Sequence, residues 1–446
     1  MKVATSSLKG HTSSILCVAI DHTNNTSHVA AGAESGTCPI RVWDTRIDGK
    51  RCQMAIRSNT TSFQGEVTSV AFAPGHLLFC SWEQSIAAYD LRRPDQHVIQ
   101  TFEDNVWYLN NFASDEINQI SISSVQPSGK WKIACCEDGG DVHVFQVGDG
   151  ARDKDDKHRL GIEHTCLSGV HDNLCTAVRW QHGSDRILVS GSMDATICMW
   201  NASSKKPVTG GRITCGPDTN SASTSGGTQL LNPPFVNSID VGHRTCAVGL
   251  GDGTVGIYNL SDQRPMCRLR GHDAATACVT FVRGTTEDNE ADNWNHLFSG
   301  GNDNKICLWN LNEREREEKK SKKNNGDNND NDDGDWEDMM SEMTTAATTT
   351  NTNSSSSKKK KRRNKKNNGK RRRKNKNKET NRKEETSLVT DARVVEEEEE
   401  DDTYIPIRFE HPHKINWLDA SRTNDGTIRL FVADSSNDIT VYTGFQ

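Results

Sequence analysis

The sequence lacks the features that mark membrane proteins and secreted proteins. No run approaches the ~18 apolar residues that cross a bilayer, so we expect no transmembrane segment. The first residues, MKVATSSLKGH, have no apolar core of signal-peptide length, and we therefore expect an intracellular chain, in the nucleus, the cytoplasm or both. Apolar residues make up only 33% of the 446, which indicates that part of the chain does not fold into a core.

Features of enzymes and metal sites are missing too. None of the 14 Cys residues forms a CxxC pair with zinc spacing, and the 15 His residues are scattered, so we expect no metal, cofactor or disulfide framework. There is no GxSxG, HExxH or P-loop motif, and GDGTVG (251–256) falls in a hairpin turn rather than between a strand and a helix. We therefore expect a protein that is not an enzyme. Most Cys residues lie in apolar, strand-like runs where a thiol acts as a small apolar group: Cys17, Cys135, Cys136, Cys198, Cys246 and Cys307.

A repeat is present instead. A stretch of small residues leads into a turn with Asp or Gly, and a β-rich stretch follows that ends in an aromatic residue. The clearest copies are VSGSMDATICMWN (189–201), VGLGDGTVGIYNL (248–260) and FSGGNDNKICLWN (298–310). Seven short hairpins at near-regular spacing predict radial β repetition. Their terminal aromatics lie 46 to 58 residues apart, except for a last interval of 133: Trp43, Tyr89, Phe145, Trp200, Tyr258, Trp309 and Tyr442.

Upstream of two of these hairpins, Gly-His precedes an alternating strand, in LKGHTSSILCVAI (8–20) and LRGHDAATACVTF (269–281). Gly-His upstream and Trp-Asp-like ends downstream at this period resemble WD repeats, which implies an all-β, seven-bladed propeller. The resemblance also implies a structural, hydrogen-bonded tetrad that offsets the desolvation of a buried Asp. Its members here would be His272, Ser299, Asp303 and Trp309. Blades 1, 3 and 7 depart from the six-residue spacing between Asp and the aromatic.

The two ends of the chain are predicted to pair. The last repeat reaches Tyr442 without an outermost strand, and the segment VATSSL (3–8) is strand-like, so the termini should close the ring and cover exposed strand edges. The long last interval is explained by residues 312–402, which are too poor in apolar side chains to offset the entropy of ordering. We expect blades 1–6 in residues 1–311, a disordered charged insert in 312–402, and blade 7 in 403–446.

The insert contains a basic block, residues 358–383, with 17 Lys or Arg residues. It is interpreted either as a nuclear or nucleolar localisation signal or as a solvated tract that pairs loosely with the acidic runs of the insert. No aromatic residue is interleaved to stack on bases, so only non-specific contact with nucleic acid is expected. The candidate signal residues are Lys358, Lys359, Lys360, Lys361, Arg362, Arg363, Lys370, Arg371, Arg372, Arg373 and Lys374.

Two strand ends carry Arg two places after Asp, in WDTR (43–46) and YDLR (89–92). They fall in consecutive blades with equal register, so Arg46 and Arg92 should project side by side on one face. This resembles the paired WDxR boxes of substrate receptors of cullin-4 ubiquitin ligases, and implies that Asp44, Arg46, Asp90 and Arg92 bind the ligase adaptor, damaged-DNA-binding protein 1. A guanidinium suits this because it makes forked bonds to carboxylates or carbonyls. The alternative is that each Arg only braces its own Asp or the next turn.

The segments QLLNPPFVNSI (229–239) and EHPHKINWLDA (410–420), with the Lys-rich insert, are similar to the family of WD repeat-containing protein 53 over nearly the whole propeller. This resemblance implies a monomeric scaffold that acts as a cullin-4 substrate receptor for an unidentified client protein. The alternative is a nuclear or nucleolar scaffold for histones or ribosome assembly, guided by the basic block.

The client would bind the face opposite the Arg boxes, where residues enter the inner strands. The candidates are mostly acidic, which suits a basic peptide, and include two aromatics of the kind that anchor interfaces. For each residue the alternative is an ordinary solvated rim or a partly buried Trp. The set is Glu66, Trp82, Trp107, Asp115, Glu116, Asp172 and Asp273.

Overall fold

The structure, a computed structural model, describes residues 3–22, 27–46, 52–57, 65–92, 98–101, 105–124, 129–147, 162–216, 233–284, 295–311 and 404–445. All of them belong to one compact unit made of Met1–Glu318 and Asp402–Gln446. These described stretches contain strands and turns and no helix. They accordingly include no helix long and apolar enough to cross a membrane.

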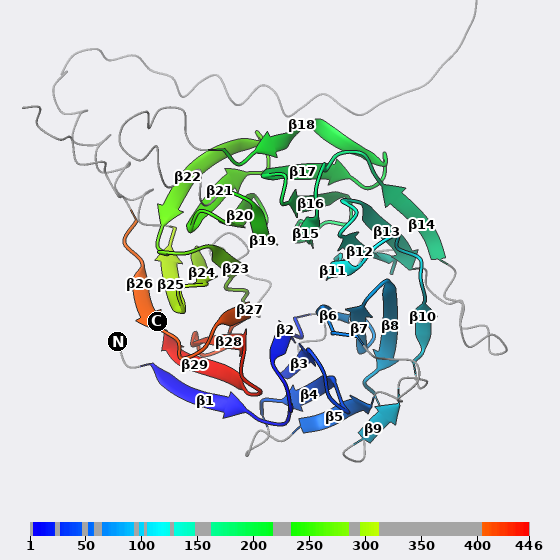
Figure 1. The fold of residues 1–446 in the computed structure, drawn as a ribbon, viewed down its shortest axis with the longest axis vertical. Helices are drawn as coiled ribbons and strands as arrows, with labels where there is room; N and C mark the ends of the chain where they lie inside the picture. Colours follow the sequence, from blue (N-terminus) through cyan, green and yellow to red (C-terminus); the bar gives the residue numbers. More distant parts are fainter. Residues whose placement is uncertain are drawn as a thin grey trace, which may run out of the picture. The chain divides into compact units, whose positions relative to one another are not determined.

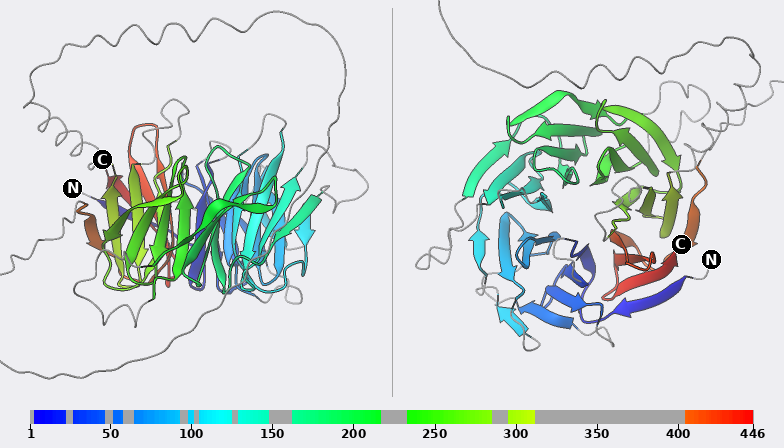
Figure 2. Two further views of the ribbon diagram at one scale, coloured as in Figure 1. Left: turned by 90° about the horizontal axis from the view of Figure 1, so that it is seen from above. Right: turned by 180° about the vertical axis from the view of Figure 1, so that it is seen from behind.

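The strands of this unit form seven sheets that stand around a common centre (Figure 1). Within each sheet neighbouring strands are antiparallel, apart from one parallel pair at the outer edge of one sheet, and the innermost strands surround the centre while the outermost ones form the periphery. Figure 2 shows the strands running side by side between two opposite faces of the ring. The predicted all-β, seven-bladed propeller is therefore confirmed.

Blades 1 to 4 are listed here from the inside outward. Blade 1 has β2 (Ile15–Ile20), β3 (His28–Ala33), β4 (Ile40–Asp44) and β5 (Cys52–Arg57), and blade 2 has β6 (Ser69–Ala73), β7 (Leu77–Trp82), β8 (Ser85–Asp90) and β10 (Trp107–Leu109). Blade 3 has β11 (Ile117–Ile122), β12 (Trp131–Glu137), β13 (Val142–Val147) and β14 (Ile162–Leu167), and blade 4 has β15 (Cys175–Trp180), β16 (Ile187–Ser192), β17 (Thr196–Asn201) and β18 (Lys206–Thr214).

Blades 5 to 7 follow the same order. Blade 5 has β19 (Val236–Val241), β20 (Thr245–Leu250), β21 (Thr254–Asn259) and β22 (Arg264–Arg270), and blade 6 has β23 (Thr276–Phe281), β24 (His296–Gly301), β25 (Lys305–Asn310) and β26 (Ile407–Glu410). Blade 7 has β27 (Ile415–Arg422), β28 (Ile428–Asp434), β29 (Ile439–Phe445) and, outermost, β1 (Ala4–Leu8).

The small residues of the repeat lie where one blade packs on the next. A side chain at Gly32 would meet the Val67 side chain of blade 2 at 2.3 Å, and one at Gly191 would meet Val236 of blade 5 at 2.4 Å. Real Cβ atoms do not approach other atoms this closely, so a larger residue would push the blades apart. The A, S and G stretch of each repeat is therefore a requirement of blade-to-blade packing.

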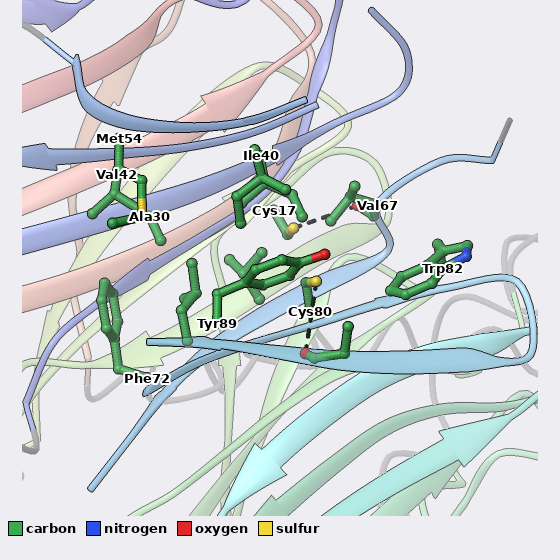
Figure 3. Packing of buried hydrophobic residues seen from close by; sticks show 14 residues of the cluster. Cys17, Ala30, Ile40, Val42, Met54, Val67, Phe72, Cys80, Trp82 and Tyr89 are labelled. Carbon is green, nitrogen blue, oxygen red and sulfur yellow. Dashed lines mark hydrogen bonds between the residues drawn. The ribbon is translucent and has the colours of Figure 1, made fainter. Parts of the chain in front are cut away.

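The middle strands are buried on both faces by neighbouring blades. In the cluster between blades 1 and 2, Val42, Phe72 and Tyr89 pack together with two buried thiols (Figure 3). One of these, Cys17, lies 3.5 Å from the Val67 carbonyl, and burial raises the pKa of this thiol to about 12. All six Cys residues predicted in strands are buried, which confirms that they act as small apolar side chains.

The two ends of the chain close the ring as predicted. Strand β1 pairs antiparallel with β29, in register from Ala4 opposite Thr443 to Leu8 opposite Ile439. Leu8 is 1% exposed and packs with Ile15 and Val29 of blade 1 and Val441 of blade 7. The first strand of the chain thus joins the first and last blades.

Two details of connectivity differ from a simple repeat. Residues 312–402, the predicted insert, lie outside the described residues, and the chain re-enters the propeller at β26, which pairs with β25. Strand β26 therefore completes the sheet of blade 6, although it lies within the range predicted for blade 7 (403–446). The sheet of blade 7 begins at β27. In addition, β9 (Val98–Thr101) crosses back from blade 2 and pairs in parallel with β5 at the outer edge of blade 1.

Candidate functional site

The predicted tetrad of blade 6 is a connected set of hydrogen bonds. The His272 ring lies with Nδ1 3.1 Å from Asp303 Oδ1 and Nε2 2.8 Å from Ser299 Oγ. Trp309 Nε1 donates to the same Ser299 oxygen at 2.9 Å. The Asp303 carboxylate also accepts a backbone bond from Asp273 N at 3.0 Å, which fixes the chain entering the inner strand. The arrangement holds the blade together and has no free reactive group.

Blade 4 contains an equivalent set that the sequence analysis did not single out. His171 Nε2 lies 2.8 Å from Ser190 Oγ, which also accepts from Trp200 Nε1 at 2.8 Å, and His171 Nδ1 lies 3.3 Å from Asp194 Oδ2. The spacing of Asp194 and Trp200 already pointed to it. His171 does not follow a Gly directly, because Val170 separates it from Gly169, so the Gly-His signal is missing in this blade.

Blades 7, 3 and 1 replace the tetrad in three ways. In blade 7 the His411 ring bridges Asp434 at 2.7 Å and the Tyr442 hydroxyl at 2.8 Å. In blade 3 the buried carboxylate comes from Glu137, which accepts the backbone N–H of Ser114 at 2.8 Å. In blade 1 both ring nitrogens of buried His11 have no hydrogen-bond partner, so this blade has no tetrad.

The two Arg boxes lie on one end of the propeller, here called the arginine face and defined by Arg46 and Arg92. In blade 1 the register places Asp44 opposite His28, at the start of the second strand. In blade 2 it places Asp90 opposite Leu77. Both boxes therefore follow the third strand of their blades at the same end, as the equal register predicts.

In each box the Arg side chain and backbone N–H donate hydrogen bonds to the Asp two residues earlier. Arg46 donates to the Asp44 carboxylate through Nε at 3.0 Å and Nη2 at 2.7 Å, and its backbone N–H donates to the same group at 2.9 Å. Arg92 repeats this geometry on Asp90, with Nε at 2.9 Å and the backbone N–H at 3.0 Å. The hydrogen bond from Arg46 holds the pKa of Asp44 below its usual value. The bracing predicted as the alternative is thus present, yet it leaves the side chains of Arg46 and Arg92 64% and 43% exposed.

The opposite end of the propeller, here called the acidic face, carries five carboxylates on blades 2 and 3. Glu66, Asp115 and Glu116 are exposed, as predicted for client-binding residues. Burial, and then the negative charges of Asp138, Glu66, Glu83 and Asp115, raise the pKa of Glu116. Repulsion of this kind is relieved by a cationic partner.

The remaining candidates do not join this cluster. Trp82 and Trp107 are 2% and 1% exposed, so the prediction that they present aromatic anchors on the surface is wrong. Trp82 ends the second strand of blade 2 inside the core between blades 1 and 2 (Figure 3), and Trp107 begins the outer strand β10 inside the core between blades 2 and 3. Asp172 and Asp273 are exposed but pair with Arg212 and Lys305, respectively.

Side chains of the inner strands link neighbouring blades around the centre. Near the arginine face, Ser121, Asp240 and Asp419 occupy equivalent positions in blades 3, 5 and 7. Each accepts a hydrogen bond from the inner strand of the next blade, at 3.2, 2.8 and 2.8 Å, respectively: Trp180 N, Phe281 N and Ile20 N. The equivalent position of blade 4 is Arg179, which sequence reasoning did not single out because one Arg in an alternating strand reads as an exposed residue.

The Arg179 side chain reaches across the centre. Its guanidinium carbon lies 5.8 Å from the ring centre of Trp417, which belongs to blade 7, and its Nε lies 3.7 Å from Asp240 Oδ1 of blade 5. Arg283, which follows the inner strand of blade 6, donates to the same Asp240 oxygen at 2.6 Å and lies 3.6 Å from Asp419. Charged groups from blades 4 to 7 thus meet at the centre.

A cavity lies on each side of this meeting point. One, of about 340 Å³, opens at the ends of the inner strands on the arginine face and is lined by Arg179, Arg283 and residues of blades 1 to 5. The other, of about 480 Å³, lies at the beginnings of the inner strands on the acidic face, between blades 1, 5, 6 and 7. No group of His, Cys, Asp and Glu side chains in the described part of the chain could hold a metal ion.

Comparison with known proteins agrees with this architecture. The model of the WD domain, G-beta repeat, matches residues 2–44, 164–201 and 263–310. The chain carries WD40 repeats. A WD repeat-containing protein 53 homolog from Dictyostelium discoideum is 29% identical over 320 residues, which cover 69% of this chain and 77% of that protein. The crystal structure of the WD40 β-propeller domain of Doa1 superposes with a TM-score of 0.54 at 12% identity, covering 99% of this chain and 96% of that one.

These findings support a protein-interaction scaffold, because WD40 propellers typically bind protein partners and are generally non-catalytic. The tetrads agree with this interpretation. Their His, Asp and Ser side chains resemble catalytic groups, but they hydrogen-bond one another and connect the strands within a blade.

Proposed function

We propose that this WD40 propeller is the substrate-recognition subunit of a cullin-4 ubiquitin ligase and binds damaged-DNA-binding protein 1 through Asp44–Arg46 and Asp90–Arg92. The observation that carries the proposal is the repetition of one geometry on consecutive blades. In both boxes the Asp receives the backbone N–H and Nε of its Arg, and the guanidinium stays exposed beyond it.

This geometry suits docking because the Asp fixes the direction of the Arg before a partner arrives. A side chain that is already ordered loses less rotamer entropy on binding. The Nη1 group of each Arg makes no hydrogen bond within the described residues, so it can donate to a carboxylate or carbonyl of the adaptor.

The client would bind at the acidic face, around Glu66, Asp115 and Glu116. None of these three carboxylates has an ion-pair partner among the described residues, and burial and then the neighbouring carboxylates raise the pKa of Glu116, so a Lys- or Arg-rich segment of the client suits this surface. Adaptor and client then occupy opposite ends of the propeller and do not compete.

Affinity purification from the cells of origin tests the proposal, with the adaptor quantified for wild type, Arg46→Ala/Arg92→Ala and a control. The control Arg186→Ala/Arg244→Ala removes the same charge from two exposed Arg residues in turns on the arginine face. We expect wild type and control to recover the adaptor, and the double Arg-box variant to recover at least tenfold less while still folded. Equal recovery by all three would refute adaptor binding through the boxes.

A nuclear or nucleolar scaffold is the other candidate function. It depends on the basic block 358–383, which lies outside the described residues. Deletion of residues 312–402 separates the two functions. The ligase proposal expects adaptor recovery to survive the deletion, whereas the scaffold requires the insert and tolerates loss of Arg46 and Arg92.

A further inference from the structure

The cavity on the arginine face has an apolar wall and a cationic floor. Most of its lining is apolar, including Phe72 of blade 2, Ile122 of blade 3 and Val241 of blade 5. Its floor is formed by the guanidinium groups of Arg179 and Arg283, whose side chains are 22% and 20% exposed. Both groups are therefore largely withdrawn from solvent but still reachable from the mouth.

The two Arg residues differ in what they bind. Arg283 lies between two carboxylates, with Nη2 2.6 Å from Asp240 and Nη1 3.6 Å from Asp419. Each of these Asp residues also accepts a backbone N–H of another blade, as described above. Although burial opposes it, the attraction of Asp240 and Asp419 raises the pKa of Arg283. Arg283 and its two partners form a satisfied structural group.

Arg179 has weaker partners, an ion-pair contact with Asp240 and the face of the Trp417 ring. Its contact with Asp240, at 3.7 Å, is longer than a hydrogen bond, its Nε is buried without an acceptor, and its guanidinium donates no hydrogen bond to any described residue. Burial lowers the pKa of Arg179 despite the nearby Asp240. A guanidinium carries five N–H donors, and buried donors left without acceptors are costly.

Packing of the blades does not account for this residue. At the equivalent positions, Ser121, Asp240 and Asp419 accept a hydrogen bond from the next blade, and Arg179 has no acceptor with which to do so. It therefore makes no bond of this kind and places a guanidinium whose Nε lacks a hydrogen-bond acceptor at an open cavity. A buried polar group that is unsatisfied in this way requires an explanation, and at an open cavity a ligand is one.

We propose that this cavity binds a carboxylate on an apolar stem, the aspartate or glutamate side chain of a partner protein, with Arg179 as the group that binds it. The stem would pack on Phe72, Ile122 and Val241 while the carboxylate accepts a forked pair of bonds from the Arg179 guanidinium. The volume of about 340 Å³ accommodates such a side chain.

A phosphate group suits the cavity less well. Of the serine hydroxyls that line it, Ser121 Oγ accepts from Trp180 N, and Ser123 Oγ accepts from Lys132 N and donates to Ser124 O. A forked pair of donors on one guanidinium matches the two oxygens of a carboxylate, whereas a phosphate has a further oxygen and more charge to be bound. The cavity opens on the same end of the propeller as Arg46 and Arg92, but the site does not depend on which protein docks there.

Ligand-observed NMR titration of the full-length protein tests the site, with acetyl-Glu-amide, acetyl-Gln-amide and inorganic phosphate as probes at constant ionic strength. We expect saturable binding of acetyl-Glu-amide, with an affinity at least tenfold greater than that of acetyl-Gln-amide or phosphate. In Arg179→Gln the affinity for acetyl-Glu-amide should fall at least tenfold. The control Arg186→Gln removes an exposed Arg from the turn that follows β15 and should change nothing.

Arg179→Lys provides a second test should Arg179→Gln not fold, because it keeps the charge but loses the forked donors, and we expect intermediate affinity. Equal binding of the Glu and Gln probes by wild type would overturn the proposal without the use of any variant. Phosphate binding as strong as that of acetyl-Glu-amide would overturn the assignment to a carboxylate. Because no adaptor is present, none of these results depends on the proposed ligase function.

Discussion

Closure of the ring by the first strand can be tested with one buried side chain. Leu8 is the last residue of β1, is 1% exposed, and packs with residues of blades 1 and 7. Leu8→Ala removes three carbon atoms and leaves a space that the surrounding β-structure can only partly fill. Substitutions of this kind cost about 2–5 kcal/mol of unfolding free energy. The cost should fall on the whole propeller, because loss of β1 leaves the edge of β29 unpaired and opens the ring.

The assay is urea unfolding followed by tryptophan fluorescence, with the unfolding free energy extrapolated to water. Two controls frame the result. Thr5→Ala changes an exposed residue of the same strand and should cost less than about 0.5 kcal/mol. Leu188→Ala creates a cavity in blade 4, where Leu188 is 0% exposed, and should cost about 2–5 kcal/mol like Leu8→Ala. If Leu8→Ala costs no more than Thr5→Ala, β1 does not close the ring and the pairing with β29 contributes little to stability.

Two further predictions concern buried polar groups. Burial, and then Arg41, lowers the pKa of His11 to about 3. Below about pH 6.5 the imidazole of His11 therefore binds a proton in the unfolded chain but not in the folded chain. Stability should therefore fall as pH falls from 6.5 towards 3, and His11→Phe should reduce the slope by about 1.4 kcal/mol per pH unit in urea unfolding measured at pH 4 to 6. Ser299→Ala leaves His272 and Trp309 without their shared partner and should cost about 1–3 kcal/mol, whereas the exposed Ser203→Ala should cost less than about 0.5 kcal/mol by the same assay.

Features that recur from blade to blade could be predicted from the sequence. Small residues such as Gly32 and Gly191 mark blade-to-blade contacts, and these contacts recur after blades 1, 4, 5 and 6, so the pattern is visible without a structure. The pairing of β1 with β29 was predictable because an incomplete last repeat needs a strand that the N-terminus can supply. The paired geometry of Arg46 and Arg92 followed from equal register.

Features that occur once were not predictable. The burial of Trp82 and Trp107 cannot be predicted, because the sequence around an aromatic residue near a turn does not show whether a neighbouring blade covers it. Strand β9 pairs with the neighbouring blade in parallel, and no local pattern specifies that choice. Arg179 was missed because its significance depends on Asp240 and Trp417, which come from blades far away in the sequence.

The centre of the propeller explains how one small fold can present two different surfaces. Inner-strand side chains that accept backbone bonds from the next blade, such as Asp240 and Asp419, hold the ring together. The same carboxylates hold Arg283, and Arg179 reaches across to Trp417, so charged groups from four blades occupy the space between the two cavities. A partner bound at the arginine face then meets exposed guanidinium groups, while a partner at the acidic face meets carboxylates. If adaptor and client bind as proposed, opposite charges select different segments, so the two faces would favour different partners.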